Sequence, residues 1–210
     1  MQMFTLNSIG VILAIALGLL INQFIGLDGV IMMAIFLLVS AYITSYEYNQ
    51  KKSLGLYDYT RGWQNVFSNG VMPVIFAAVS GMYGIFPFLG SVASIMADKM
   101  SSEIGVIDKD VYDILGFSKV KPGVNGGISV TGTLASLTGG LIMGISAAYL
   151  FGITPSQAFM VGVCGLAGSL ADSVAGHFEE RGFGNKGTSN MAGSAFGGAL
   201  AILLHSMGMI

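Results

Sequence analysis

The sequence has little charge: Asp, Glu, Lys and Arg make up 10% of its 210 residues, against about 25% in an ordinary soluble domain. Hydrophobic residues make up 53%, and mean hydropathy is +0.74. This composition excludes a soluble globular domain and predicts an integral membrane protein. The apolar segments are long and do not alternate with a period of two residues, so we expect helices rather than a transmembrane barrel.

Cysteine is almost absent, and the single Cys164 excludes a disulfide framework and a cysteine-based metal site. The formal net charge of −2 gives no basic field, so no nucleic acid is expected as a partner. The sequence has no P-loop, and GFGNKG at 182–187 follows an apolar helix rather than a strand, which removes the context of a dinucleotide site. The two histidines, His177 and His205, are expected to be structural.

The nine Lys and Arg residues fall in three polar segments, 47–65, 98–127 and 177–189. The positive-inside tendency predicts that all three face the cytoplasm. An even number of spans must then separate neighbouring polar segments, which predicts a polytopic all-α protein with seven transmembrane helices in one domain, 1–210. The expected spans are 4–25, 30–46, two short helices within 66–97, 129–151, 155–176 and 190–209.

The two short helices are expected to break around 81–84 and to restart near Pro87, because 32 residues are fewer than two full spans of about 20 residues need. Six spans are the alternative, with 66–97 forming one long tilted helix and an interfacial piece. Residues 1–46 form an N-terminal helical hairpin in both cases. The first span lacks a basic flank and a small-x-small cleavage site, so we expect it to be retained.

A carboxylate and hydroxyl cluster follows the third apolar region, in ADKMSSEIG. Asp98 and Ser102 share a helical face, whereas Glu103 points roughly 140° away from Asp98 at about 100° per residue. Oxygen ligands of this kind suit Mg²⁺. The alternative is an acidic helix end in which Lys99 and Glu103 form an ordinary i, i+4 pair.

A second carboxylate lies in GLAGSLADSVAG, where small residues recur at helical spacing. The glycines are interpreted as sites of close helix packing. That interpretation does not explain Asp172, because a charge at membrane depth is costly and is a functional hypothesis by default.

The stretch KVKPGVNGGISVTGT at 119–133 has the composition of a phosphate-binding loop. Gly126 and Gly127 permit unusual backbone angles, and Ser129 or Thr131 is placed to cap the next helix. Free N–H groups at a helix start bind anions, and two lysines would add charge-assisted bonds. The alternative is a flexible loop with an ordinary helix cap and lysines that contact lipid headgroups.

Together these segments resemble a family of small membrane proteins that includes plant phytyl-phosphate kinase and uncharacterised archaeal, bacterial and animal transmembrane proteins. The similarity covers about residues 61–199. It is carried by RGWQNVFSNG, ADKMSSEIG, KPGVNGGISVTGT, GSLADSVAG and the asparagine before the last span. A looser similarity reaches dolichol kinase and the CDP-lipid synthases.

The resemblance implies a catalytic core at 61–199 on the cytoplasmic side of the membrane. It would transfer the γ-phosphoryl group of CTP, or another nucleoside triphosphate, to a prenyl monophosphate such as phytyl or geranylgeranyl phosphate. The implied catalytic residues are Asp98, Glu103, Lys121 and Asp172, and one or two Mg²⁺ ions would be held by Asp98, Glu103 and Asp172. The implied nucleotide and phosphate contacts are Lys119, Gly123, Gly126, Gly127, Ser129, Thr133, Arg61, Asn69, Lys186 and Asn190.

Two other functions stay open at this point. A cytidylyltransferase making a CDP-activated lipid would use the same carboxylates, metals and lysines. A transporter of lipids or small molecules would use Asp172 and the broken helices, without a nucleotide. The expected partners are the bilayer, the prenyl phosphate and the nucleotide, and a homo-oligomer is compatible with the sequence.

Overall fold

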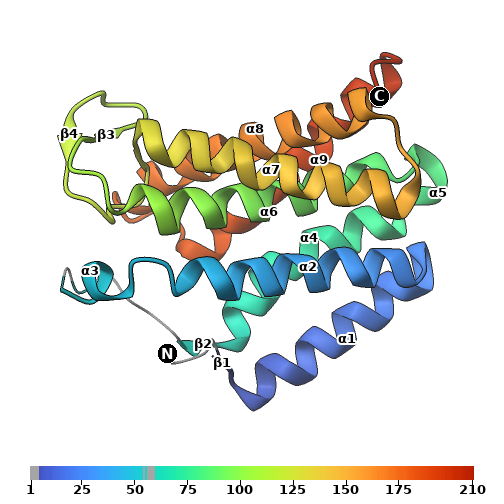
Figure 1. Ribbon diagram of the computed structural model, residues 1–210, viewed down its shortest axis with the longest axis horizontal. Coiled ribbons are helices and arrows are strands. Elements are labelled where there is room, and N and C mark those ends of the chain that lie inside the picture. Colours follow the sequence, from blue (N-terminus) through green and yellow to red (C-terminus); the bar gives the residue numbers. More distant parts are fainter. Residues whose placement is uncertain (1–4, 54, 56–59) are drawn as a thin grey trace.

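The computed structural model describes residues 5–53, 55 and 60–210, without the side chains of residues 5, 48, 50, 60 and 61. Long helices run between two ends of the molecule (Figure 1). They are α1 (Ser8–Ile25), α2 (Leu27–Thr44), α4 (Trp63–Ala78), α6 (Phe86–Gly105), α7 (Val130–Phe151), α8 (Pro155–Glu179) and α9 (Lys186–Ser206). The described residues also form two short helices, α3 (Tyr48–Ser53) and α5 (Ser80–Tyr83).

The helix ends follow recognisable sequence signals. The Asn7 side chain accepts a hydrogen bond from the Gly10 amide at 2.7 Å and starts α1. Thr154 and Gln157 form a reciprocal capping box at the start of α8, directly before Pro155. Gly152 ends α7 in the left-handed conformation, with φ of 67°.

Helix α6 is the centre of the bundle and packs against α7, α8 and α9. Its side chains Phe88, Leu89 and Met96 are fully buried. Small residues bring the neighbouring helices close together: a Cβ at Gly140 of α7 would lie 2.5 Å from the carbonyl oxygen of Gly162 in α8. The bundle is therefore held by close backbone packing, as is usual for helices in lipid.

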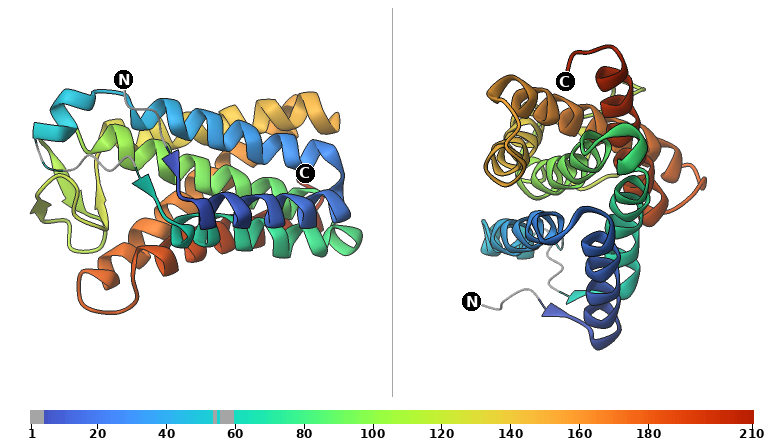
Figure 2. Two further views of the ribbon diagram at one scale, coloured as in Figure 1. Left: turned by 90° about the horizontal axis from the view of Figure 1, so that it is seen from below. Right: turned by 90° about the vertical axis from the view of Figure 1, so that its right-hand side faces the viewer.

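Helices α1 and α2 form the predicted N-terminal hairpin, which lies on one side of the α6–α9 bundle (Figure 2). Helix α1 packs against α4, and α2 packs against α6. The outer face of α1 is apolar, with Ile12 and Leu19 about two-thirds exposed. Such a face is suited to contact with lipid tails.

The break predicted at 81–84 is confirmed. Helix α4 runs away from one end of the molecule, α5 turns the chain, and α6 returns from Phe86 (Figure 1). The single long helix of the six-span alternative is therefore wrong. Among the described residues, α1, α2, α7 and α8 are long and apolar enough to cross a membrane. Seven crossings and the cytoplasmic orientation of the loops stay predictions.

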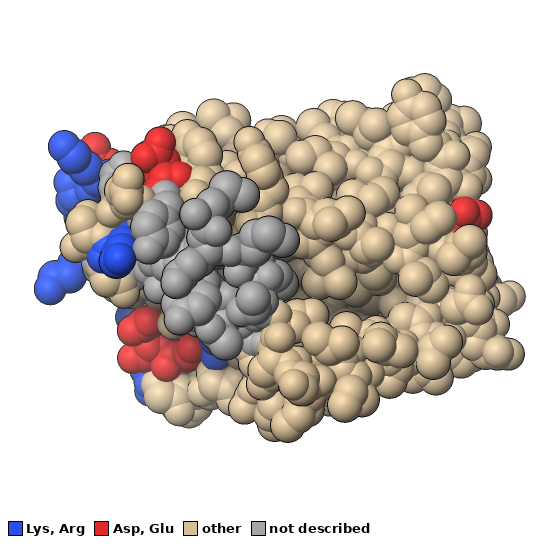
Figure 3. All heavy atoms as spheres, turned by 60° about the horizontal axis from the view of Figure 1, so that its bottom comes forward, with Lys and Arg blue, Asp and Glu red and all other residues tan. Residues whose placement is uncertain are grey.

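The three polar segments meet at one end of the molecule, where Lys, Arg, Asp and Glu gather (Figure 3). The central segment is not purely helix and loop as expected. It forms an antiparallel sheet in the order β4 (Lys119–Val120), β3 (Val111–Asp113), β5 (Gly127–Ile128). A parallel pair, β1 (Thr5–Leu6) and β2 (Thr60–Arg61), joins the starts of α1 and α4. The predicted helical architecture is confirmed, since the described residues are mostly helical, and the short strands are an addition to it: backbone groups in the polar loops pair with each other.

Candidate active site

Two carboxylates and one lysine meet where α6, α8 and α9 come together. Lys186 Nζ lies 2.9 Å from Asp172 Oδ2 and 3.9 Å from Asp98 Oδ2. Asp172 is 3% exposed, and Lys186 is its charge partner at the first position of α9. The predicted functional carboxylates of α6 and α8 are thus neighbours.

The pair Asp98 and Asp172 fits Mg²⁺ in one of the ways in which proteins hold that ion. Both carboxylates face one cation, the Lys186 ammonium group, so their oxygens point to a common region. Mg²⁺ is commonly bound by one or two carboxylates, with waters and substrate phosphates completing the octahedron. Within the described part of the chain, no group of three or more His, Cys, Asp or Glu could hold a metal ion. The donor set therefore suits a metal that arrives with a phosphorylated ligand.

Glu103, predicted as a third metal ligand, has a different environment. Its carboxylate pairs with Lys51 at 2.8 Å and with Lys99, and it accepts a hydrogen bond from Thr44 Oγ1 at 3.0 Å. The Lys99 pair is the i, i+4 alternative raised from the sequence. The assignment of Glu103 as a ligand beside Asp172 is corrected for this reason: its oxygens join α2, α3 and α6.

The glycine-rich loop is fixed against the C-terminal turns of α8. A Cβ at Gly126 would lie 2.6 Å from the backbone nitrogen of His177, and Gly126 has φ of +80°. The Asn125 amide nitrogen and side chain donate to Glu180 and Glu179 at 3.0 and 3.2 Å. Ser129 caps α7 by accepting from the Gly132 amide, as one of the two predicted caps. The loop is therefore positioned by specific contacts.

A second contact joins β3 to α8. His177 Nδ1 lies 2.6 Å from Asp113 Oδ1, and Arg181 Nη2 lies 3.8 Å from Asp113 Oδ2. Burial raises the pKa of the Asp113 carboxyl, but hydrogen bonds from His177 and the backbone of Leu115 outweigh it and leave the pKa below its ordinary value. Asp113 thus stays ionised at neutral pH, and the structural role expected for His177 is confirmed.

These elements enclose a polar cavity of about 240 Å³. The two carboxylates and Lys186 form one wall, and the loop from Gly123 to Gly127 forms another, next to Ser129. Lys51 and Glu103 also line it. Acidic groups, two lysines and a glycine-rich backbone thus surround a space at the polar end of the molecule.

The predicted loop lysines lie outside this cavity lining. Lys119 is exposed and pairs with Asp110 at 2.5 Å, and Lys121 is also exposed. Thr133 donates to the Ser129 carbonyl oxygen within α7. The structure therefore does not bring these three residues to the cavity. The two lysines lie at the exposed β4 edge of the β4-β3-β5 sheet, and Thr133 lies in the first turn of α7.

Lysines from other elements take their place. Lys51 reaches the cavity from α3, and Lys186 reaches it from α9. Lys186 was among the expected phosphate contacts, whereas Lys51 was missed. Its sequence signal was weak, since Lys51 and Lys52 look like any basic pair beside a membrane span.

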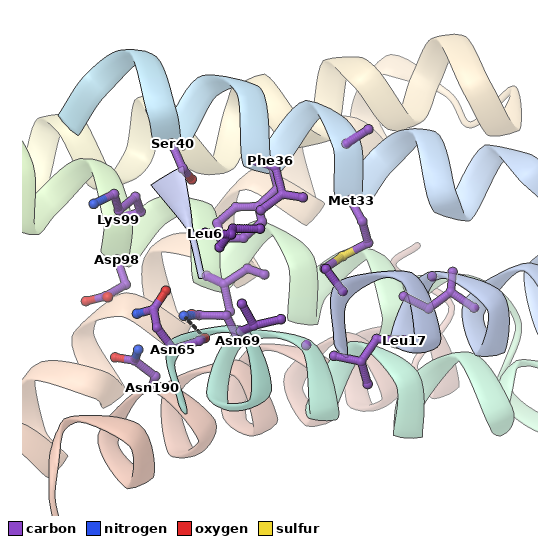
Figure 4. A pocket seen from close by; sticks show the side chains of 18 of the residues that line it. Leu6, Leu17, Met33, Phe36, Ser40, Asn65, Asn69, Asp98, Lys99 and Asn190 are labelled. Atoms are coloured by element: carbon purple, nitrogen blue, oxygen red, sulfur yellow. Dashed lines mark hydrogen bonds between the residues drawn. The ribbon is translucent and has the colours of Figure 1, made fainter. Parts of the chain in front are cut away.

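A second, mainly apolar cavity of about 210 Å³ adjoins the first (Figure 4). It lies between α1, α2, α4 and α6, and Asp98, Ser102 and Lys186 line both cavities. The expected contacts Asn69 and Asn190 lie at this second cavity. Arg61 is placed in β2, but its side chain lies outside the described residues.

Known proteins resemble the chain over most of its length. An uncharacterized membrane protein of Methanocaldococcus jannaschii is 29% identical over 95% of this chain and 86% of its own length. The Arabidopsis thaliana protein named VTE6, chloroplastic, is 26% identical over 95% of this chain and 65% of its own. Protein PGR of the same plant is 34% identical over 55% of this chain and 42% of its own. No solved structure matches the chain.

The family comparison covers nearly the whole molecule, including the hairpin, the carboxylate pair and the glycine-rich loop. The model of an integral membrane family matches residues 1–205. The chain belongs to the family described as integral membrane protein DUF92.

Proposed function

We propose that the protein is a membrane-embedded kinase that transfers the γ-phosphoryl group of a nucleoside triphosphate, in the first place CTP, to a prenyl monophosphate. The observation that supports this best is the meeting of Asp98, Asp172 and Lys186 on a wall shared by a polar and an apolar cavity. The resemblance to the family of plant phytyl-phosphate kinase points to the same chemistry.

The reaction joins two anions. An oxygen of the prenyl phosphate attacks the γ-phosphorus, the bond from that phosphorus to the β–γ bridging oxygen breaks, and the nucleoside diphosphate leaves. A phosphate monoester has a second pKa of about 6, so its oxygen is already anionic at neutral pH and needs no strong general base. The protein must position the two phosphates and offset their repulsion.

The residues of the polar cavity match these requirements. Asp98 and Asp172 would hold Mg²⁺, which when bound supplies positive charge to the phosphate oxygens. Lys186 would leave its pair with the Asp172 carboxylate and pair with a phosphate oxygen. Its side chain is 47% exposed and has room to move. The backbone of Gly123 to Gly127 would line the nucleotide phosphates. The amides of Val124, Asn125 and Gly127 already donate within the protein, so the donors to phosphate would be the Gly123 and Gly126 amides.

The test uses purified protein, Mg²⁺, geranylgeranyl monophosphate and CTP labelled at either the α- or the γ-phosphorus. Label entering the lipid from the γ position alone is the expected result, and removal of Mg²⁺ with EDTA should stop it. Label from the α position alone would identify a cytidylyltransferase. No transfer to any of several lipid phosphates would overturn the proposal and favour transport.

Matched variants connect the activity with the site. Asp98→Asn and Asp172→Asn keep the side-chain volume but remove a metal-binding charge, and each should lower kcat by about 100-fold or more. Asp28→Asn is the control, because Asp28 is exposed in the first turn of α2, far along the helix from the polar end. Equal activity in all three variants would contradict the assignment of the carboxylates.

A further inference from the structure

We infer that the apolar cavity binds the tail of the acceptor lipid and that Gly18 sets the tail length that the cavity accepts. The inference rests on the proposed function for the identity of the head group. The location of the tail follows from the shape and polarity of the cavity itself.

The cavity has a polar end and an apolar end (Figure 4). Asn65, Asp98 and Asn190 lie at the polar end, while Leu17 and Met33 lie farther along the slot. The part of α2 that lines it runs from Val30 to Ser40, a length of about 15 Å at 1.5 Å per residue. A slot of this kind suits an amphiphile with a polar head and one extended apolar tail.

Two buried polar atoms at this cavity have no hydrogen-bond partner among the described residues. They are Ser40 Oγ and Asn190 Oδ1, and both side chains line the cavity. Their residues are 3% and 7% exposed. Buried polar groups are normally hydrogen-bonded, so a polar ligand or its water shell is the natural partner of these atoms.

The two cavities share Asp98, Ser102 and Lys186. A lipid with its tail in the apolar slot would therefore present its head group at the carboxylate pair. The nucleotide would approach from the glycine-rich loop on the other side. Each substrate thus has its own cavity, and the reacting phosphates meet at the shared wall.

Gly18 of α1 is the position at which the slot can be shortened with least disturbance. It lines the cavity, and a Cβ there would meet no atom within 4 Å. Gly70, on the facing α4, is unsuitable because a Cβ would lie 2.5 Å from Leu17 Cδ1. A Phe at position 18 would project into the apolar half of the slot and leave the polar end unchanged.

The first experiment compares geranyl and geranylgeranyl monophosphate as acceptors. Gly18→Phe should lower kcat/KM for geranylgeranyl monophosphate by about tenfold or more, because the new ring occupies space that the longer tail needs. It should change kcat/KM for geranyl monophosphate by less than about twofold. Gly81→Phe is the matched control, because Gly81 is exposed in α5 and a Cβ there also meets nothing. If the ratio of the kcat/KM values for the two acceptors is the same in Gly18→Phe as in the wild-type protein, the inference is overturned.

The second experiment needs no activity and no variant. Geranylgeranyl monophosphate with a diazirine at the end of its tail is photo-crosslinked to the wild-type protein without nucleotide, and unlabelled geranylgeranyl monophosphate competes. Crosslinks should fall on the apolar end of the slot, at Ile21, Val30 and Met33. Crosslinks on the outer faces of α7 and α8 that do not compete would overturn the inference. If the proposed kinase reaction fails but these crosslinks form, the tail site stands without it.

Discussion

Among single residues, Lys51 shows how a charge is tolerated next to the apolar bundle. It is 1% exposed, and its ammonium group donates to the Thr44 carbonyl and to Glu103, each at 2.8 Å. A buried ammonium group needs such partners, because burying an unpaired charge is very costly. These bonds attach α3 to the end of α6, beside the polar cavity.

Replacing Lys51 by Met should destabilise the protein. The substitution leaves the Glu103 carboxylate with Lys99 and Thr44 but removes one charged partner, which we expect to cost about 1–3 kcal/mol. Thermal unfolding in detergent measures the change in Tm. Lys109→Met, at an exposed position, should leave Tm nearly unchanged, and an equal drop in both variants would contradict this role of Lys51.

At the scale of elements, the glycine-rich loop is organised by its contact with α8. Gly126 and Gly176 bring the two backbones together, since a Cβ at Gly176 would lie 2.7 Å from the Gly126 nitrogen. The β4-β3-β5 sheet flanks the loop, and the Asp113 to His177 contact attaches this sheet to α8 as well. The loop backbone is therefore held in one conformation beside the cavity, with the Gly123 and Gly126 amides as the proposed donors to an anionic ligand.

Gly126→Ala should displace the loop and lower kcat by about tenfold or more, because the new methyl group meets the His177 backbone, which cannot move aside as a flexible side chain would. The left-handed φ adds about 1–2 kcal/mol of strain. Gly182→Ala is the control: Gly182 has φ of +88°, and a Cβ there meets nothing within 4 Å.

Both variants therefore have backbone strain, and Gly126→Ala alone has the collision. We expect the strain to lower Tm in both variants, with a larger drop in Gly126→Ala because of the collision, and a loss of phosphoryl transfer in Gly126→Ala only. Comparable turnover in the two variants would show that the contact with α8 does not position the loop. Steady-state kinetics with CTP and geranylgeranyl monophosphate provide the measurement.

The sequence predicted the helices well and the site in part. Asp172 stood out because a carboxylate among small apolar residues is expensive, and the structure pairs it with Lys186 near Asp98. The spacing of residues along the sequence did not show where the side chains of Glu103 and Lys121 lie in the fold. Glu103 has partners that lie 52 and 59 positions away, Lys51 and Thr44. The exposed Lys121 directly follows β4, and the pairing of β4 with β3 depends on the fold.

At the scale of the whole molecule, most of the charged side chains seen in Figure 3 gather at one end, and an acidic group lies at the opposite end. The three basic segments predicted to share the cytoplasmic side are joined there by contacts between distant positions, such as Lys51 with Glu103 and Asn125 with Glu179. The opposite end contains α5 and the turn between α7 and α8 (Figure 1). The molecule is therefore polarised along its long axis.

This polarity predicts the outcome of cysteine labelling in sealed vesicles. The buried Cys164 is replaced by Ala, and single cysteines are introduced at the exposed positions Ser118, Gly182, Met82 and Ser156. An impermeant maleimide should modify the first two from the cytoplasmic face and the last two from the opposite face. Labelling of Ser118→Cys and Gly182→Cys from different faces would contradict the shared orientation of the polar loops.

The placement of the hairpin beside the α6–α9 bundle has an evolutionary consequence. Asp98, Asp172 and Lys186 come from the bundle, whereas Gly18 and Met33 belong to the hairpin. Under the proposed function, substitutions in α1 and α2 can therefore alter which lipids are accepted while the proposed phosphoryl-transfer groups stay in place. Paralogues that diverge in their choice of lipid are expected to vary first in the hairpin, and chimaeras that exchange α1 and α2 should inherit the lipid preference of the hairpin donor.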